Sequence, residues 1–350
     1  MKKWIALLMS MLMLLACCVG CGAKKPEEPA QEPVAEKAIP TPKPEPVVVP
    51  NPLTGEPLNN ADAVNNRPVA VMLNNIHYAM PQHGVSDADM IFEFNVEGGI
   101  TRMVGFFQEP DKVGTIGSVR SARPCFVETV LGMDAFYAHC GGSQEALNMI
   151  YNLGIDDLNA TEGVFWRDAE RAKTMDYEHT LMTSGENLAN YIAGSDWRLQ
   201  HNADYEYPIT YVEDGTPANG TDANHVAVRF SNYKTGTFDY NAKNGKYMIG
   251  QYDSEYIDGN TGNQVGVTNL LVLRTTVYDS GDSKGHMVID LQGSGDGMFF
   301  CGGKAIEINW EKAEMSDPFT YYLTDGTPLS LGVGHTYVCV IANDADVTVE

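Results

Sequence analysis

The first 21 residues constrain the chain most, because they decide which part of it can belong to a folded body. Lys2 and Lys3 precede an apolar run over residues 4–15 that only Ser10 interrupts. A run this short is typical of a secretory signal rather than of a membrane-spanning helix. We therefore expect residues 1–21 to be a signal peptide and the rest of the chain to be exported.

A cysteine follows the apolar run in the position at which bacterial lipoproteins are processed. Cys17 follows Ala16, with Leu14 and Leu15 before it, and Cys21 offers a second but weaker match. We expect Cys17, or alternatively Cys21, to carry acyl chains. These chains would hold the protein at the extracytoplasmic face of the cell membrane. An ordinary signal peptide with incidental cysteines is the alternative.

The segment that follows cannot form a core. Residues 24–52 contain nine prolines, separated mainly by Glu, Lys, Ala and Val. This composition predicts an extended, polyproline-rich tether over residues 22–52.

Charge and cysteine content exclude several classes of partner. The chain has 350 residues and a formal net charge of −23, which argues against nucleic acid and against lying flat on anionic lipid. Outside the signal region its cysteines are Cys125, Cys140, Cys301 and Cys339, with no spacing typical of zinc ligands. We expect no metal and no cofactor. Disulfides Cys125–Cys140 and Cys301–Cys339 stay open as alternatives to free buried thiols, which we favour.

Two regions follow the tether, and together they predict an α+β protein. Residues 53–210 alternate apolar strands with helices, which predicts an α/β layered domain. Its strands are expected at 67–73, 90–96, 102–107, 112–116 and 135–139, and its helices at 121–133, 143–151 and 184–194, with Ser121, Ser143 and Ser184 as N-caps.

Residues 220–345 lose the helical periodicity and predict an all-β antiparallel sandwich or barrel domain. Its strands are expected at 226–230, 246–252, 269–273, 286–291, 297–301, 305–310 and 337–341. The glycine-rich stretch 293–297 is expected to be a turn, and the boundary between the two regions is expected within 205–224.

The stretch 117–124 (GSVRSARP) is the most informative internal motif. Arg120, Ser121 and Arg123 lie where a helix is expected to begin, and Arg102 precedes them on a neighbouring strand. Guanidinium groups beside a helix N-terminus favour a phosphate or a carboxylate. The alternative is that these arginines form internal ion pairs with acids such as Glu93 and Glu97.

The acidic set itself, Asp89, Glu93 and Glu97, is open to two interpretations. Glu93 and Glu97 flank a strand end and could act as acid and base or bind a cation. Neutralisation of the arginines is the interpretation that we favour.

The stretch 137–143 (YAHCGGS) places His139 and Ser143 around a glycine turn. A serine nucleophile with His139 as its base is one interpretation, and Cys140 as nucleophile is another. Ser143 as a simple helix N-cap explains the pattern better.

These polar motifs give the chain a family resemblance. It resembles the YerB-like family of Gram-positive surface lipoproteins, whose two domains have no known function. The matching runs are 51–55 (NPLTG), 67–75 (RPVAVMLNN), 81–82 (PQ), 97–102 (EGGITR), 117–123 (GSVRSAR), 141–143 (GGS), 240–247 and 329–340. Ser118 stands where the family pattern has proline, and residues 178–180 (EHT) stand where it has Pro-His-Asn. The resemblance implies a two-domain lipoprotein but no chemistry.

A second likeness is shorter. Residues 112–120 and 139–142, with the helix that follows, are similar to part of the LytR-CpsA-Psr phosphotransferases, which act on lipid-linked wall-polymer precursors. The likeness implies that Arg120 would contact a pyrophosphate. The aspartate that these enzymes place beside that arginine is replaced here by Ser121.

We therefore predict a non-enzymatic, membrane-anchored binding module for an anionic cell-wall component or an envelope partner protein. A phosphotransferase is the alternative. The residues predicted to bind the ligand are Arg102, Arg120, Arg123, Ser121, Glu93, Glu97, His139 and Ser143.

Overall fold

The computed structural model describes residues 48–350, which belong to one compact unit. The predicted signal peptide, Cys17, Cys21 and the tether up to residue 47 lie outside the described residues. Regular pairing begins at Pro50, which forms an isolated bridge with Pro57. Within 48–350 no helix is long and apolar enough to cross a membrane.

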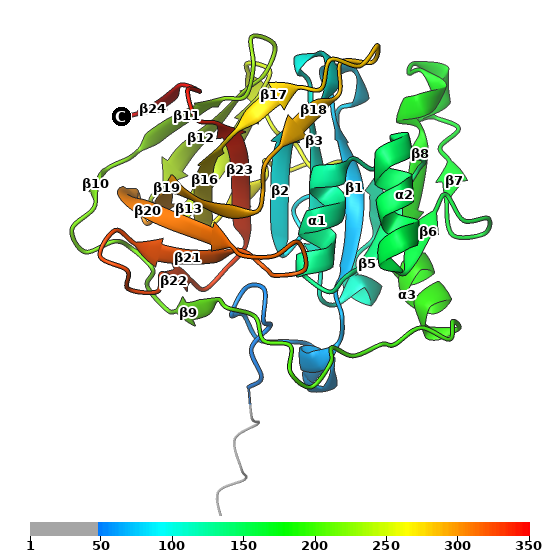
Figure 1. Cartoon of the computed structure of the whole chain (residues 1–350), viewed down its shortest axis with the longest axis horizontal. Helices are drawn as coiled ribbons and strands as arrows, with labels where there is room; N and C mark the ends of the chain where they lie inside the picture. The colour runs from blue at the N-terminus through cyan, green and yellow to red at the C-terminus, as the bar shows by residue number, and fades with distance from the viewer. Residues whose placement is uncertain (1–47) are drawn as a thin grey trace, which may run out of the picture. The chain divides into compact units, whose positions relative to one another are not determined.

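A mixed sheet of eleven strands runs through both sequence regions (Figure 1). The first region supplies β1 (Val69–Asn75), β2 (Met90–Asn95), β3 (Thr101–Phe107), β5 (Phe136–His139) and β6 (Asp157–Asn159). The second region supplies β10 (Thr221–Asp222), β16 (Asn269–Thr275), β19 (Gly293–Cys301), β20 (Lys304–Lys312), β21 (Thr320–Leu323) and β23 (Thr336–Ala342). The strand order is β10-β20-β19-β16-β23-β2-β3-β1-β5-β6, and β21 pairs with β20.

The two regions meet where β2 pairs in parallel with β23, with Phe92 opposite Val338. All seven residues of β1 are buried, and so are the first six of the seven residues of β23. Strands that are buried along their length and apolar over most of it are typical of sheets covered on both faces. The sheet therefore has a core on each side.

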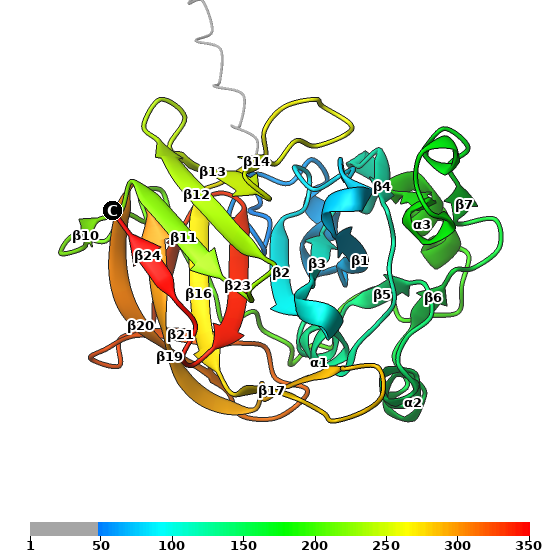
Figure 2. The same ribbon diagram turned by 90° about the horizontal axis from the view of Figure 1, so that it is seen from above.

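Helices cover both faces of the first region. α1 (Pro124–Gly132) and α2 (Gln144–Leu153) lie on one face, where Phe126 of α1 packs edge-on against Phe94 with ring centroids 5.0 Å apart. On the other face lie α3 (Gly185–Ala193) and a three-stranded sheet of β4 (Thr115–Gly117), β8 (Leu181–Ser184) and β7 (Trp166–Arg167). Figure 2 shows α1 and α2 on the side of the sheet opposite α3.

A six-stranded sheet covers the second region. It consists of β11 (His225–Arg229), β12 (Thr235–Asn241), β13 (Lys246–Gln251), β14 (Ser254–Glu255), β15 (Gly266–Val267) and β24 (Val347–Val349). Phe238 of β12 packs against Tyr337 of β23, with ring centroids 5.4 Å apart. This contact joins the two layers of a β-sandwich.

Shorter elements complete the described chain. Two small sheets pair β9 (Thr210–Val212) with β22 (Ser330–Gly332), and β17 (Val277–Asp279) with β18 (Met287–Ile289). The 3₁₀ turns are η1 (Ala61–Asn65), η2 (His77–Ala79), η3 (Glu97–Gly99), η4 (Pro110–Lys112), η5 (Arg171–Lys173) and η6 (Tyr177–His179).

The predicted fold class is confirmed: the protein is α+β, with an α/β layered first region and a β-rich second region. One detail differs from the expected antiparallel arrangement, because β16 and β23 pair in parallel. No helix or strand covers residues 213–219, which lie between β9 and β10.

The start of the first helix was predicted wrongly. Ser121 is not its N-cap, because α1 begins at Pro124 and Arg123 occupies the N-cap position in an extended conformation. Proline is favoured at the first helical position and forces the preceding residue out of the helical region. Pro124 was therefore the better signal for the helix start.

The stretch 293–297 was also predicted wrongly, because it forms the first half of β19 rather than a turn. A Cβ atom on Gly295 would lie 2.6 Å from the carbonyl oxygen of Arg274, and one on Gly297 would lie 2.6 Å from that of Val272. These glycines mark a close approach of neighbouring strands, a role that glycine has in strands as well as in turns.

Candidate functional site

Three of the predicted ligand-binding residues, Glu97, Arg102 and Arg123, lie together at the connection between β2 and β3. This connection, η3, is tight because Gly98 and Gly99 adopt positive φ angles of 68° and 76°. Glu97 therefore lies close to the start of β3, where its carboxylate contacts Arg102.

Glu97 binds two of the three predicted arginines. Its Oε1 accepts hydrogen bonds from Nη2 of Arg102 and from Nη2 of Arg123, the latter at 2.5 Å. Its Oε2 accepts a hydrogen bond from Nε of Arg123 at 2.9 Å. The remaining Nη1 groups donate to backbone carbonyls, Arg102 to Ser121 at 3.0 Å and Arg123 to Ala122 at 2.7 Å. We call Glu97, Arg102 and Arg123 the Glu97 cluster. Its contacts are those of the internal ion pairs that we gave as the alternative to an anion site.

The electrostatics of the Glu97 cluster follow from its burial. Burial acts to raise the pKa of Glu97, but Arg102 and Arg123 outweigh this effect and lower the pKa to about 2. Burial, followed by repulsion from Arg123, lowers the pKa of Arg102 to about 9. Glu97 and Arg102 are therefore both charged at neutral pH, and with the second guanidinium group the cluster carries one net positive charge.

Arg120 does not contact Glu97 and lies instead against Glu178. Its Nη1 donates to the backbone carbonyl of Glu178 at 3.1 Å, and its Nη2 lies 3.5 Å from Oε1 of Glu178. Burial and the nearby Arg120 lower the pKa of His179, whose Nδ1 contacts Nδ2 of Asn74 at 3.0 Å. The structure thus brings Arg102 and Arg123 together on one acid, while Arg120 belongs to the adjoining 178–179 segment.

Glu93 has no arginine partner among the described residues. It is fully buried between the two layers of the sandwich, 3.2 Å from Nζ of Lys234. Sequence reasoning missed Lys234, because a lysine in a turn between two strands is normally solvated. Asp89, the third acid of the set, accepts hydrogen bonds from the backbone N–H of Gln108 and from Asn51 Nδ2.

His139 and Ser143 do not form a nucleophile and base. His139 is buried, with Nδ1 at 2.8 Å from the carbonyl oxygen of Gly141 and Nε2 at 3.0 Å from Oδ2 of Asp157. Ser143 accepts a hydrogen bond from the backbone N–H of Ala146 at 3.2 Å, which confirms its prediction as the N-cap of α2. Both ring nitrogens of His139 are engaged away from Ser143.

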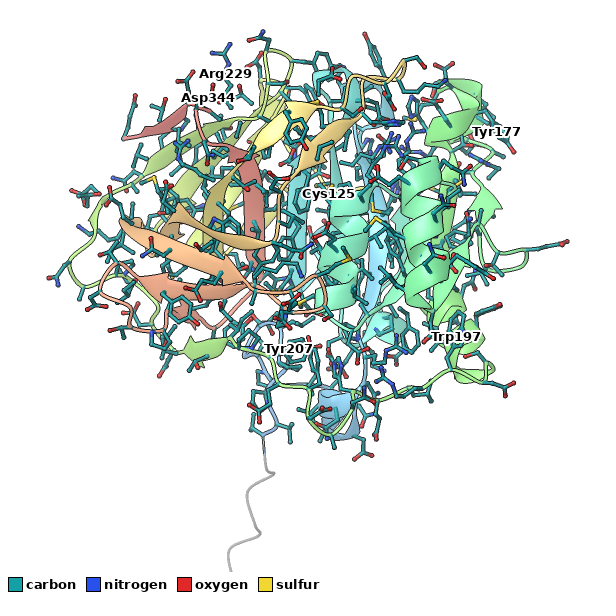
Figure 3. The ribbon with its side chains drawn as sticks, in the orientation of Figure 1. Cys125, Tyr177, Trp197, Tyr207, Arg229 and Asp344 are labelled. Atoms are coloured by element: carbon teal, nitrogen blue, oxygen red, sulfur yellow. The ribbon has the colours of Figure 1, made fainter. Side chains whose placement is uncertain are left out.

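The four cysteines of the described range are free, which is the alternative that we favoured over disulfides, and three of them are buried while Cys140 is half-buried. Cys125 lies on α1 (Figure 3), where burial raises the pKa of its thiol to about 12. A thiol protonated at neutral pH is a poor nucleophile. Within residues 48–350, no group of three or more histidine, cysteine and acidic side chains is arranged to hold a metal.

A surface cavity adjoins the Glu97 cluster. It has a volume of about 500 Å³ and is lined by Glu97, Ser121, Arg123, Gly142, Ser143, Gln144, Lys284 and His286. Four of these residues, Glu97, Ser121, Arg123 and Ser143, were predicted to belong to the site. Lys284 and His286 come from the loop between β17 and β18. The sequence gave no sign that these two residues belong to the site, because their loop has the composition of an ordinary polar turn.

A larger cavity of about 840 Å³ continues from the first one and shares Ser143, Gln144 and His286 with it. It lies between α1, α2 and the β17–β18 hairpin, and its walls include Cys125, Met149 and Leu291. The two cavities form a groove with a basic end, at Arg123 and Lys284, and a longer end that is partly apolar and also lined by Glu128, Glu145, Asp282 and Asp290.

Comparison with known proteins identifies the family. Residues 53–198 match the model described as "Protein of unknown function (DUF3048) N-terminal domain", and residues 226–338 match the corresponding C-terminal domain. Over 269 residues the chain is 31% identical to a Bacillus subtilis (strain 168) protein named "Putative lipoprotein YerB". The aligned residues make up 75% of this chain and 77% of the relative.

A solved structure agrees with this match. The crystal structure of the YerB protein from Bacillus subtilis is similar with a TM-score of 0.73 and 26% sequence identity, covering 86% of this chain and 99% of that one. Neither the family description nor these names mentions a phosphotransferase. With both of its regions matched, the chain belongs to the YerB-like DUF3048 family, whose two domains are of unknown function.

Proposed function

We propose that this protein is an extracytoplasmic lipoprotein that is anchored through Cys17 and binds an anionic cell-wall component. The anchor is supported by the signal-like residues 1–21 and by the lipoprotein name of the Bacillus relative. Membrane attachment would hold the groove close to the cell wall, where anionic polymers are abundant.

The basic end of the groove carries the binding proposal. Arg123 and Lys284 line the same cavity in a chain whose formal net charge is −23. Glu97 is the single acid among the residues lining that cavity. A local excess of positive charge on an acidic protein concentrates anions at that point.

The two basic residues have different roles in this proposal. Glu97 occupies the guanidinium fork of Arg123, which therefore contributes positive potential rather than a free pair of donors. The ammonium group of Lys284 makes no ion pair or hydrogen bond with any other described side chain. Lys284 is thus the residue best placed to donate directly to a phosphate or a carboxylate.

The start of α2 adds to the same end of the groove. Ser143 caps the N–H of Ala146, while Gln144 and Glu145 at the first turn have backbone N–H groups without a partner in the helix. These groups and the helix dipole favour negative charge at the cavity wall.

The proposal is tested with the purified protein and a soluble poly(glycerol phosphate) as the probe. Lys284→Ala should weaken binding about ten-fold, a loss of ~1.5 kcal/mol that is typical of one charge-assisted contact. Added salt should weaken binding by the wild type, because screening reduces the attraction between exposed charges.

Lys243→Ala is the matched control, since Lys243 is also exposed and lies in the turn between β12 and β13. It should bind like the wild type. Equal affinities of the two variants, or no binding by the wild type, would contradict the proposal.

A further inference from the structure

A lysine is completely buried in the core of the sandwich. Lys234 ends the turn between β11 and β12, and its side chain has no exposed surface. Its Nζ lies over the rings of Phe230 and Tyr252, at 5.3 and 5.6 Å from their centroids. Lysine is almost never buried this completely unless its charge is paired.

One carboxylate oxygen connects this amine to a side-chain amide. Glu93 Oε1 lies 3.2 Å from Nζ of Lys234 and accepts a hydrogen bond from Nδ2 of Asn75 at 2.7 Å. The second oxygen of Glu93 accepts a hydrogen bond from the hydroxyl of Tyr337 at 2.7 Å. The amine of Lys234 and the carboxamide of Asn75 thus both lie against one oxygen of Glu93, which also accepts a hydrogen bond from the hydroxyl of Thr101, and all four side chains are closed to water.

An ordinary ion pair does not satisfy this site. Nζ of Lys234 has no acceptor in hydrogen-bonding geometry among the described residues, and neither Oδ1 of Asn75 nor the side-chain amide of Gln251 has a partner there. Buried polar groups without partners are costly, and a buried charge is more costly still. The largest of these free-energy costs is that of the buried Lys234 ammonium. A reaction that consumes the amine would remove this charge from the core.

We propose that Lys234 and Asn75 become joined by an intramolecular amide bond, with Glu93 as the proton carrier. Transfer of one proton from the Lys234 ammonium to the Glu93 carboxylate gives a neutral amine, which is the nucleophile. Nζ attacks the carboxamide carbon Cγ of Asn75, and the Nζ–Cγ bond forms.

The Cγ–Nδ2 bond then breaks. Glu93 returns its proton to Nδ2, and the second proton of the attacking nitrogen follows through the same carboxyl group, so the leaving group departs as ammonium. One lysine ammonium and one carboxamide become one secondary amide and one ammonium ion. Atoms and charge balance, and neither an oxidant nor a cofactor is required.

The bond would tie the two sequence regions together. Asn75 is the last residue of β1, in the first region, and Lys234 lies between two strands of the sheet that covers the second region. A cross-link over so long a stretch of chain restricts the unfolded state. It would make the protein resistant to denaturation and proteolysis outside the cell.

Peptide mass spectrometry of the native full-length protein tests this inference. The protein is denatured and digested with trypsin, which cleaves after free lysine. The expected result is no cleavage after Lys234 and a branched peptide that contains Asn75 and Lys234, lighter by one ammonia than its two parts. The branched peptide also excludes cyclisation of an asparagine, which loses ammonia without joining two peptides.

Lys312 provides an internal control. It is also buried, but its Nζ donates to the backbone carbonyls of Met315 and Asp317, so it should stay free and be cleaved. Cleavage of the wild type after Lys234 as complete as after Lys312, with the Asn75 peptide at its unmodified mass, would overturn the proposal.

Two variants separate the chemistry from the burial. Lys234→Arg keeps the positive charge but cannot form the amide, and Glu93→Gln removes the proton carrier. Both should lack the branched peptide. A branched peptide of unchanged yield in Glu93→Gln would refute the role of Glu93, and the wild-type digest decides the bond itself even if a variant fails to fold.

Discussion

The substitution Glu97→Gln separates the two interpretations of the arginine motif. Glutamine has nearly the shape of glutamate but no charge, so the variant leaves Arg102 and Arg123 without their shared acid. The side chains of these arginines are only 3% and 11% exposed. We expect the folded state to be strongly destabilised, because two largely buried like charges would face each other unpaired.

The pKa of Glu97 gives the size of the expected loss in free energy of unfolding. The pKa falls from the ordinary value of 4.5 to about 2 in the folded protein. Each unit corresponds to 1.36 kcal/mol, so the charged form contributes about 3 kcal/mol at pH 7. Removal of one partner from a buried ion pair typically costs 3–5 kcal/mol, which agrees with this value.

The effect should depend on pH in a defined direction. Since the folded-state pKa lies below the unfolded one, the stabilisation is complete above about pH 5 and is lost as the pH falls towards 2. The difference in free energy of unfolding between wild type and Glu97→Gln should therefore shrink in acid.

Urea denaturation followed by tryptophan fluorescence measures this difference. Glu178→Gln is the control, because Glu178 is 61% exposed and lies 3.5 Å from Arg120, so its loss should cost less than ~1 kcal/mol. An equally small cost for Glu97→Gln at pH 7 would refute the reasoning. It would mean that Arg102 and Arg123 do not depend on Glu97 and are free to bind an external anion.

Two further predictions concern the anchor and the second helix. Cys17→Ala should abolish incorporation of labelled fatty acid while Cys21→Ala retains it, and an acylated Cys21 at the mature N-terminus of the wild type would reassign the anchor. Ser143→Ala should lower the free energy of unfolding by about 1 kcal/mol, because the N-cap of α2 is lost. Ser143→Thr keeps a hydroxyl that can cap the helix and should retain most of this stability. Equal losses for the two variants in thermal or urea unfolding would contradict the capping role.

Local pattern predicted most of the elements. The apolar runs at 67–73, 90–96 and 102–107 became β1, β2 and β3, shifted by two residues or fewer at either end. Ser143 was recognised as an N-cap because capping depends on residues only three positions apart. The same reasoning misplaced the start of α1, where the proline signal outweighs the serine signal.

The arginine motif shows where local reasoning stops. The residues of 117–124 identified a charged cluster and left two interpretations open, an anion site or internal ion pairs. The structure shows that Glu97 binds Arg102 and Arg123, while Arg120 binds Glu178. Which acid meets which arginine depends on strand register and loop path, and neither has a signature in the sequence near the arginines.

By itself, the sequence determined the signal-like start, the α+β class and the polar motifs, because each depends on composition or on neighbours a few residues apart. Only the tertiary structure decided that β2 and β23 share one sheet, that Lys284 reaches the cavity beside Arg123, and that Glu93 lies between Asn75 and Lys234. These contacts join residues far apart along the chain. They are selected by the burial of whole sheet faces, and no single segment encodes that choice.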